Sequence, residues 1–212
     1  MFREDDTIVA VATPSGRGGL GVVRLSGREA QRIAAALTER QSLLQPRHAM
    51  FARFVDRVRP ASGGLGDQVI VTFFPGPHSY TGEDVVEISA HGSPVLLRAV
   101  VESAMVEGAR LAEPGEFTLR AFLHGRIDLV QAEAVRDLID AVTPLQARAA
   151  YDQLEGTLTA EIAGVDRGLF DLTVRLEASL DFPDEGYHFV ESGEAAREIA
   201  GSARSMGLQV TE

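Results

Sequence analysis

The chain has 212 residues, 45% of them hydrophobic, which is enough to bury one large core or two small ones. Its net charge is −11 and all 20 basic residues are arginine, which argues against a broad electrostatic contact with a nucleic-acid backbone. Without a lysine it has no phosphate-binding loop of the P-loop type, so it cannot by itself hydrolyse a nucleotide by that route. The absence of cysteine excludes disulfides, thiolate nucleophiles and cysteine-built zinc sites.

No targeting or membrane-spanning segment is recognisable in the sequence. No apolar run approaches the roughly 20 residues that a transmembrane helix needs. The stretch from Met1 to Asp6 is acidic, whereas a secretory signal peptide begins basic and continues apolar. We therefore expect a cytoplasmic protein with no membrane partner.

The first strands and the first helix follow from side-chain patterning. Residues 7–13 and 20–26 are rich in β-branched side chains and predict two strands joined by a turn-rich segment. Ser26 and Glu29 have the spacing of a capping box, which predicts that a helix begins there. The apolar positions of that helix recur at helical spacing: Ala30, Ile33, Ala34 and Leu37.

The pattern up to about residue 112 continues as a mixture of strands and one further helix. Serine at position 93 and proline at 94 favour a helix start, and Gly108 suits its end. Strands are predicted at 48–57, 68–74, 84–90 and 109–112, each bounded by turn residues.

No convincing strand pattern follows the turn at residues 113–115. A short helix should end at Gly125, and Asp128 can cap a helix that Pro144 closes. A long helix should stop at Pro183, and Ser192 can cap a last one. Each of the last three helices has apolar positions that should face inward. They are Val135, Leu138, Ile139 and Val142 in the helix after Asp128; Leu158, Ile162, Val165, Leu169, Leu172 and Leu176 in the long helix; and Ile199, Ala203 and Met206 in the last helix.

We therefore expect an α+β fold with two domains. Residues 1–117 should form a mixed β-sheet domain with helices, and residues 118–212 an all-helical region. The apolar faces of the helical region exceed what its few helices can cover, and the end of the sequence has the character of a truncation.

A glycine-rich segment at 16–21 satisfies the spacing G-x-G-x-x-G of a dinucleotide-binding turn. In such sites the third glycine opens a helix that directs its N-terminus at a pyrophosphate. Gly21 is instead followed by a strand, so the sequence favours a connection between two strands.

Several charged or polar positions are open to two interpretations. Arg24 and Glu87 are each expected in the middle of a strand, where each faces either solvent or a ligand. The loop at 75–84 is either an ordinary connection or a ligand loop, and His91 is interpreted as a strand-end residue without a nearby acid. Arg126 lies beside a helix start, where a salt bridge and ligand binding are equally plausible.

An ordered series of short motifs resembles the MnmE family of bacterial tRNA modification GTPases, also called TrmE. The motifs span nearly the whole chain: Asp6-Thr7-Ile8-Val9-Ala10, Thr13-Pro14, Gly16-Arg17-Gly18-Gly19, Phe74-Pro75-Gly76-Pro77, Tyr80-Thr81-Gly82-Glu83-Asp84, His91-Gly92, Pro114-Gly115-Glu116-Phe117, Arg120-Ala121-Phe122, Asp128-Leu129, Gln131-Ala132-Glu133-Ala134, Asp137-Leu138-Ile139 and Asp181-Phe182-Pro183-Asp184-Glu185.

The resemblance implies a first domain similar to the tetrahydrofolate-binding domain of aminomethyltransferases. Such a domain forms a homodimer and binds 5-formyltetrahydrofolate near the dimer interface. The family's folate-contacting positions correspond to Arg24, Glu87 and Arg126 here. At the third position the family commonly has lysine, so the positive charge is kept while the geometry of the donor changes.

The family's full activity, as the resemblance implies it, needs parts that these residues do not contain. A G domain binds GTP with magnesium and potassium, and a C-terminal tail carries a cysteine. With the flavoprotein MnmG, family members modify carbon 5 of the wobble uridine of certain tRNAs, adding an aminomethyl or carboxymethylaminomethyl group. We expect no catalytic and no metal-binding residue in this chain.

Two alternatives to the folate-binding part of such a GTPase remain. The first is a self-sufficient folate enzyme of the aminomethyltransferase kind, in which Glu87 or His91 transfers a proton. The second is a dimerisation scaffold, in which the loop at 75–84 packs on a second subunit and no ligand binds.

Overall fold

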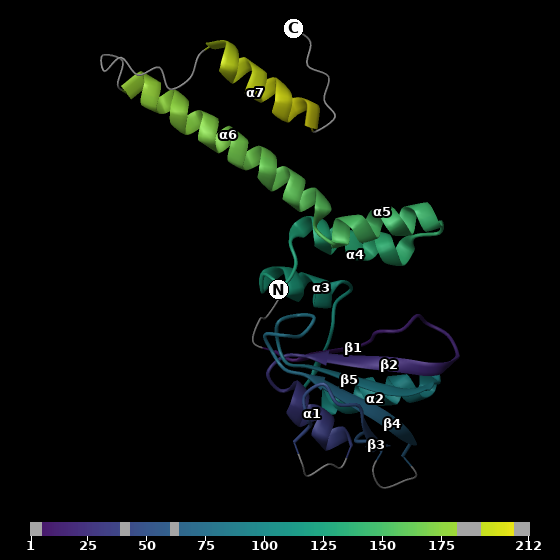
Figure 1. Ribbon diagram of the computed structural model, residues 1–212. Helices are drawn as coiled ribbons and strands as arrows, with labels where there is room; N and C mark the ends of the chain where they lie inside the picture. The colour runs from purple at the N-terminus through teal and green to yellow at the C-terminus, as the bar shows by residue number, and fades with distance from the viewer. Residues whose placement is uncertain (1–5, 39–42, 60–63, 182–191, 206–212) are drawn as a thin grey trace. The chain divides into compact units, whose positions relative to one another are not determined.

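The structure is a computed structural model that describes residues 6–38, 43–59, 64–181 and 192–205 (Figure 1). The chain forms two compact units, residues 1–132 and 133–212. The expected domain boundary at residues 117 and 118 stays a prediction, because compactness alone does not test independent folding.

A six-stranded mixed sheet organises the first unit. The strand order is β3-β4-β5-β2-β1-β6, and all neighbours are antiparallel except β1 and β6. The strands are β1 (Ile8–Val11), β2 (Gly18–Ser26), β3 (Met50–Val55), β4 (Gly66–Phe74), β5 (Val85–Gly92) and β6 (Arg110–Leu111). The sequence predicted each of these six strands, and the α+β fold class is confirmed.

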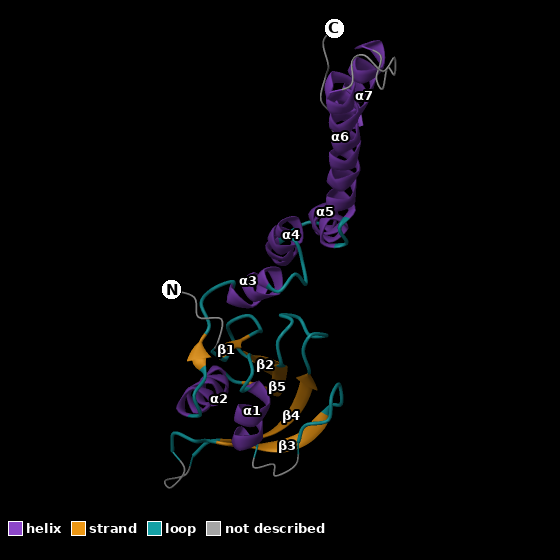
Figure 2. Cartoon of the chain, turned by 90° about the vertical axis from the view of Figure 1, so that its left-hand side faces the viewer, coloured by secondary structure: helices purple, strands orange, loops and turns teal. Residues whose placement is uncertain are grey.

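The apolar core lies between this sheet and two helices, α1 (Ala30–Leu37) and α2 (Pro94–Val106). Figure 2 shows both helices on the same side of the sheet. The alternation predicted for β5 is confirmed, since Val86, Ile88 and Ala90 are buried in this core. The other face of the sheet is therefore free to carry polar side chains.

The predicted capping box at the start of α1 is wrong. Ser26 is the last residue of β2, and Gly27, with φ of 132°, turns the chain before the helix begins. The Ser26 hydroxyl instead contacts Thr81 at 2.6 Å and Glu83 at 2.7 Å. The backbone N–H of Glu29 at the helix start donates to the side chain of Thr7 at 3.0 Å, so the residue just before β1 caps α1.

Helices make up the rest of the described chain. They are α3 (Glu116–Leu123), α4 (Leu129–Asp140), α5 (Pro144–Leu154), α6 (Thr157–Asp181) and α7 (Ser192–Ser205). The predicted cap at Asp128 is confirmed, because its carboxylate accepts the backbone N–H of Gln131 at 2.8 Å. Thr143 and Gln146 form a capping box at the start of α5.

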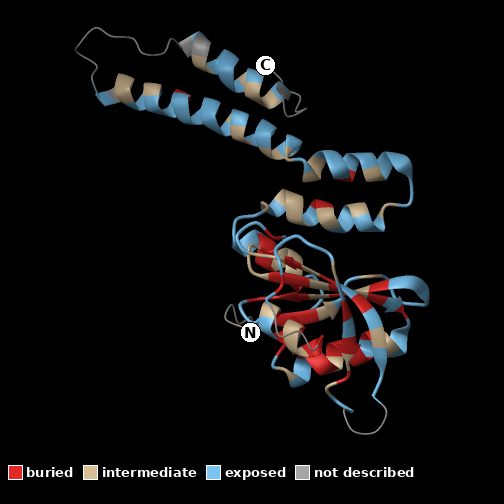
Figure 3. Cartoon of the chain, turned by 60° about the horizontal axis from the view of Figure 1, so that its bottom comes forward, coloured by how far each residue is buried: buried red, intermediate tan, exposed pale blue. Residues whose placement is uncertain are grey.

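Much of the apolar surface predicted to face inward in the helical region is exposed. Figure 3 shows most buried residues in the first unit and a largely exposed α6. Leu172 is buried, whereas Ile162 is 50% exposed and Ile139 77%. Pro183 and Met206 lie outside the described residues. None of the helices that the structure describes combines the length and apolar character needed to cross a membrane.

Candidate functional site

Arg24 and Glu87 lie directly opposite each other on adjacent strands, β2 and β5. The neighbours Val23 and Leu25 point into the core, so the Arg24 side chain lies on the other face of the sheet. Its Nε and Nη2 atoms donate to Oε1 of Glu87 at 2.9 and 2.7 Å. The two side chains keep 26% and 29% of their surface exposed. Both are therefore accessible to a ligand.

Two aromatic rings lie beside this ion pair. The guanidinium carbon of Arg24 is 5.3 Å from the ring centre of Tyr80 and 5.7 Å from that of Phe117. Tyr80 belongs to the loop between β4 and β5, and Phe117 to the first turn of α3. Distances below about 6 Å allow attraction between the cation and each ring face.

Polar contacts hold the loop of residues 75–84 against other parts of the first unit. Thr81 is fully buried, and its carbonyl oxygen lies 2.7 Å from Nδ1 of His124. The hydroxyl groups of Tyr80 and Thr118 lie 3.0 Å apart, and Arg47 donates to the carbonyl oxygen of His78 at 2.7 Å. These contacts fix the direction of the Tyr80 ring.

Arg126 lies beside the same loop, away from direct contact with the ion pair. A Cβ atom added to Gly82 would be 3.3 Å from Cγ of Arg126, so the aliphatic part of the arginine packs on this glycine. Among the residues that the structure describes, Arg126 forms no hydrogen bond or ion pair with Arg24 or Glu87. The structure thus joins two of the three predicted site residues directly and leaves the third exposed nearby in the same unit.

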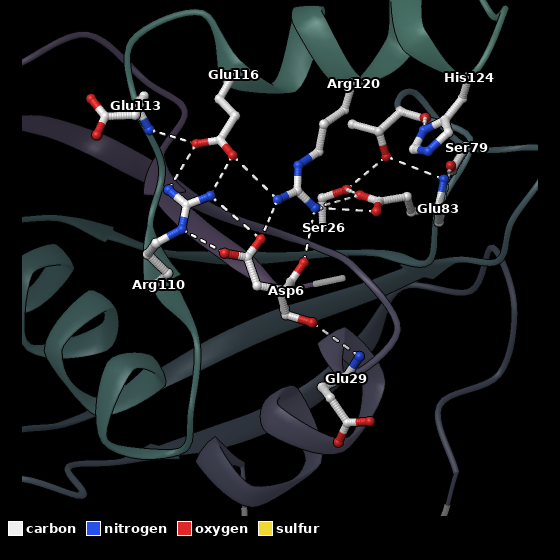
Figure 4. Close-up of polar contacts among 12 residues, drawn as sticks. Asp6, Ser26, Glu29, Ser79, Glu83, Arg110, Glu113, Glu116, Arg120 and His124 are labelled. Atoms are coloured by element: carbon white, nitrogen blue, oxygen red, sulfur yellow. Dashed lines mark hydrogen bonds and ion pairs between the residues drawn. The ribbon is translucent and has the colours of Figure 1, made fainter. Parts of the chain in front are cut away.

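A network of charges centred on the buried side chains of Glu116 and Arg120 lies under the start of α3 (Figure 4). Arg120 is 5% exposed and contacts Asp6 at 2.5 Å, Glu83 at 3.0 Å and Glu116 at 3.2 Å. Arg110 contacts Glu116 at 2.5 Å and Asp6 at 2.6 Å. Since Glu83 belongs to the loop of residues 75–84, this network ties the loop to α3 and to the edge of the sheet.

The network lowers the pKa values of two of its carboxyl groups, those of Glu116 and Asp6. Burial raises the pKa of Glu116, but hydrogen bonds from Arg110, the Glu113 backbone and Arg120 outweigh it and hold that pKa below its usual range. Burial and hydrogen bonds from Arg110 and Arg120 oppose each other in the same way at Asp6, whose pKa is also lowered. These carboxylates therefore stay ionised and structural at neutral pH.

His91, interpreted from sequence as lacking an acid partner, has one on the neighbouring strand. Its Nδ1 atom lies 2.7 Å from Asp67, which also accepts the backbone N–H of His91 at 2.9 Å. Burial raises the pKa of Asp67, yet these contacts with His91 bring it below its usual range. Asp67 is 24 residues away in sequence, so only strand pairing brings the two together.

The glycine-rich segment at 16–21 is a connection between strands, as the sequence predicted. It joins β1 to β2, and its last four residues already belong to β2, so no helix N-terminus is present for a pyrophosphate. Within the described part of the chain, no group of three His, Asp or Glu side chains could hold a metal ion.

Sequence reasoning assigned no role to Phe117, Glu116 or Arg120. The i, i+4 spacing of Glu116 and Arg120 on one helix was a usable signal, because it places opposite charges on one face. Phe117 offered no such signal, since its neighbour Arg24 lies 93 positions earlier.

The fold and the site define a two-part architecture: a mixed-sheet domain that carries a polar and aromatic site, followed by helices. Residues 7–126 match the family model described as GTP-binding protein TrmE N-terminus, and residues 129–208 match that of the MnmE helical domain. The chain belongs to the MnmE (TrmE) family.

Relatives from several bacteria carry the name tRNA modification GTPase MnmE. The chain is 51% identical to the protein of Koribacter versatilis over 92% of its own length and 43% of the relative's. It is 50% identical to that of Aromatoleum aromaticum, with 92% and 42% covered, and 46% identical to that of Nitrosomonas eutropha, with 94% and 43%. The chain thus spans less than half the length of these relatives.

Proposed function

We propose that the first unit binds a reduced folate, 5-formyltetrahydrofolate, at Arg24 and Glu87, with Arg126 as a third contact. The observation that carries this proposal is the ion pair itself, whose side chains keep 26% and 29% of their surface exposed. Both hydrogen bonds of the pair use Oε1 of Glu87, and in the described chain neither Oε2 of Glu87 nor Nη1 of Arg24 has a hydrogen-bond partner. The pair therefore offers an acceptor and donors to a ligand.

The chemistry of a pterin fits these atoms. A pterin presents an amino group beside a ring nitrogen, and a carboxylate can accept from that edge. Arginine donors suit ring carbonyl, formyl and carboxylate oxygens, and Arg126, which is exposed, has a planar guanidinium that can bind the carboxylates of a glutamate tail. The aromatic rings of Tyr80 and Phe117 border the same position.

We further propose that the chain acts as part of a tRNA modification GTPase. In that protein a G domain would bind GTP with magnesium and potassium, and MnmG would be the partner in modifying the wobble uridine of tRNA. The first unit would serve as the homodimerising, folate-binding part in the cytoplasm. The names of the relatives support the tRNA modification and the GTPase activity.

Titration calorimetry with 5-formyltetrahydrofolate tests the folate proposal. We expect saturable binding by the wild-type chain and at least about tenfold weaker binding by Glu87→Gln, because a hydrogen bond to a charged group contributes about 1.5 to 3 kcal/mol. Glu29→Gln is the matched control, since Glu29 forms an exposed ion pair with Arg32 elsewhere in the unit. Equal affinity of Glu87→Gln and wild type would remove Glu87 from the site.

One geometric feature bears on the alternative of a self-sufficient folate enzyme. A histidine whose Nδ1 is held by a carboxylate can act as a general base through Nε2, and His91 with Asp67 has this arrangement. That alternative requires turnover of a methylene-folate donor by this chain alone. Binding without turnover favours the folate-binding part of a larger enzyme.

A further inference from the structure

Two aromatic side chains of the first unit remain outside its apolar core. The core of the described residues is built from the sheet, α1 and α2, and includes neither Tyr80 nor Phe117. Tyr80 keeps 37% of its surface exposed, and Phe117 is half-buried. A large aromatic surface left open beside a charged pair is an arrangement that a flat ligand can complete.

Both rings are held in place before any ligand arrives. The hydroxyl of Tyr80 bonds with Thr118 at 3.0 Å, which joins the loop of residues 75–84 to α3. Phe117 follows directly after Glu116, whose fully buried carboxylate is fixed by Arg110 and Arg120. Rings that are already ordered lose little conformational entropy on binding, so their contact with a ligand contributes directly to affinity.

The rings and the ion pair together describe the chemistry of the ligand. Oε2 of Glu87 can accept a hydrogen bond and Nη1 of Arg24 can donate one. A ligand that satisfies both carries a donor for the carboxylate and an acceptor for the guanidinium. Since aromatic rings border the ion pair, the part of the ligand that contacts it is a flat ring.

We propose that Tyr80 and Phe117 are the ring-binding residues of the site at Arg24 and Glu87, and that they contact the pterin ring of the folate while leaving its tail to other groups. This inference rests on the proposed folate function and assigns the recognition of the ring within it. It separates the site into a ring-binding part, formed by these four side chains, and a tail-binding part.

Binding of ligand fragments tests the assignment. For Tyr80→Leu and Phe117→Leu we expect about tenfold weaker binding of both 5-formyltetrahydrofolate and the tail-free 6-methyltetrahydropterin, since stacking on an aromatic side chain contributes about 1 to 3 kcal/mol, or roughly 5- to 150-fold. The affinity for p-aminobenzoylglutamate, which lacks the ring, should stay within about twofold of the wild-type value. Phe51→Leu is the control, because Phe51 is an aromatic residue of the same unit that is 64% exposed on β3.

A second measurement uses the wild-type fold. The chain has three tyrosines, so labelling with 3-fluorotyrosine gives three fluorine NMR signals, and Tyr80→Phe identifies that of Tyr80. We expect 6-methyltetrahydropterin to shift the Tyr80 signal and to leave the Tyr151 signal in place, even if a leucine variant fails to fold.

The outcomes distinguish the two proposals. If the wild-type chain binds 5-formyltetrahydrofolate and Glu87→Gln weakens that binding, but the leucine variants bind as tightly as wild type and the Tyr80 signal does not move, the ring assignment is overturned and the folate proposal stands. If the wild-type chain binds no folate, both proposals fall.

Discussion

Arg24 and Glu87 are paired across two strands through a single carboxylate oxygen of Glu87, and the second oxygen has no hydrogen-bond partner among the described residues. We therefore expect these two side chains to contribute to ligand binding more than to the stability of the fold. A pair that is about one quarter exposed contributes little to folding, because water solvates both charges in its absence.

We therefore predict that Arg24→Gln and Glu87→Gln each lower the free energy of unfolding by less than about 1 kcal/mol. The same substitutions should weaken folate binding at least about tenfold. Urea unfolding and titration calorimetry on the same preparations measure the two effects. A large loss of stability with unchanged affinity would mean that the pair is structural.

Arg120 has the opposite character, because it is buried among three carboxylates. Arg120→Met should lower the free energy of unfolding by about 3 kcal/mol, since it leaves buried negative charges without a partner. Arg136→Met is the control: Arg136 is 86% exposed in an ion pair with Asp140, and its loss should cost less than about 0.5 kcal/mol. Similar costs in urea unfolding would contradict the structural role of Arg120.

The lowered pKa values of Asp6, Glu116 and Asp67 predict acid sensitivity of the first unit. A carboxyl group with a lower pKa in the folded state stabilises the fold above its unfolded-state pKa of about 4. That contribution, about 1.4 kcal/mol for each unit of pKa difference, is lost as the pH falls through the folded-state value.

Urea unfolding at pH 7, 5, 4 and 3 should therefore show stability that is steady down to about pH 5 and then falls. Glu116→Gln should be less stable at pH 7 and should lose less on acidification. A free energy of unfolding of the wild type that stays constant down to pH 3 would contradict the lowered pKa values of these carboxyl groups.

Gly92, at the end of β5, is required by the close approach of β2. A Cβ atom there would lie 2.6 Å from the carbonyl oxygen of Gly18 and 2.8 Å from that of Leu20, and backbone atoms of a paired strand yield poorly. Gly92→Ala should cost about 1 to 3 kcal/mol of unfolding free energy. At Gly19 an added Cβ meets nothing within 4 Å, so Gly19→Ala should be nearly neutral. Equal stabilities of the two variants would contradict this packing.

Local patterning was sufficient to predict the strands and the starts of α2, α4 and α7, whereas α5 (Pro144–Leu154) was not predicted. The alternation of Val86, Ile88 and Ala90 and the cap at Asp128 depend only on residues near in sequence, and both are confirmed. The helix start at Ser26 was wrong, because the hydroxyl has closer partners in Thr81 and Glu83, more than 50 positions away.

Sequence reasoning predicted only part of the candidate site, because the contacts of the site also join residues that are far apart in sequence. The sequence indicated that Arg24 and Glu87 each face away from the core, but their contact depends on the register of β2 against β5. The approach of Tyr80 and Phe117 depends on the buried Arg120 network, which joins residues from Asp6 to Arg120. The roles of Arg24, Glu87 and Arg126 in binding folate stay predictions.

A crystal structure of the chain with 5-formyltetrahydrofolate tests the central claim most directly. We predict the pterin ring beside Tyr80 and Phe117, with its amino edge within hydrogen-bond distance of Glu87. Folate bound instead in the cavity of about 570 Å³ lined by Val11, Pro14, Leu97, Val101, Met105 and Leu111 would contradict the account, because none of the proposed binding residues lines that cavity.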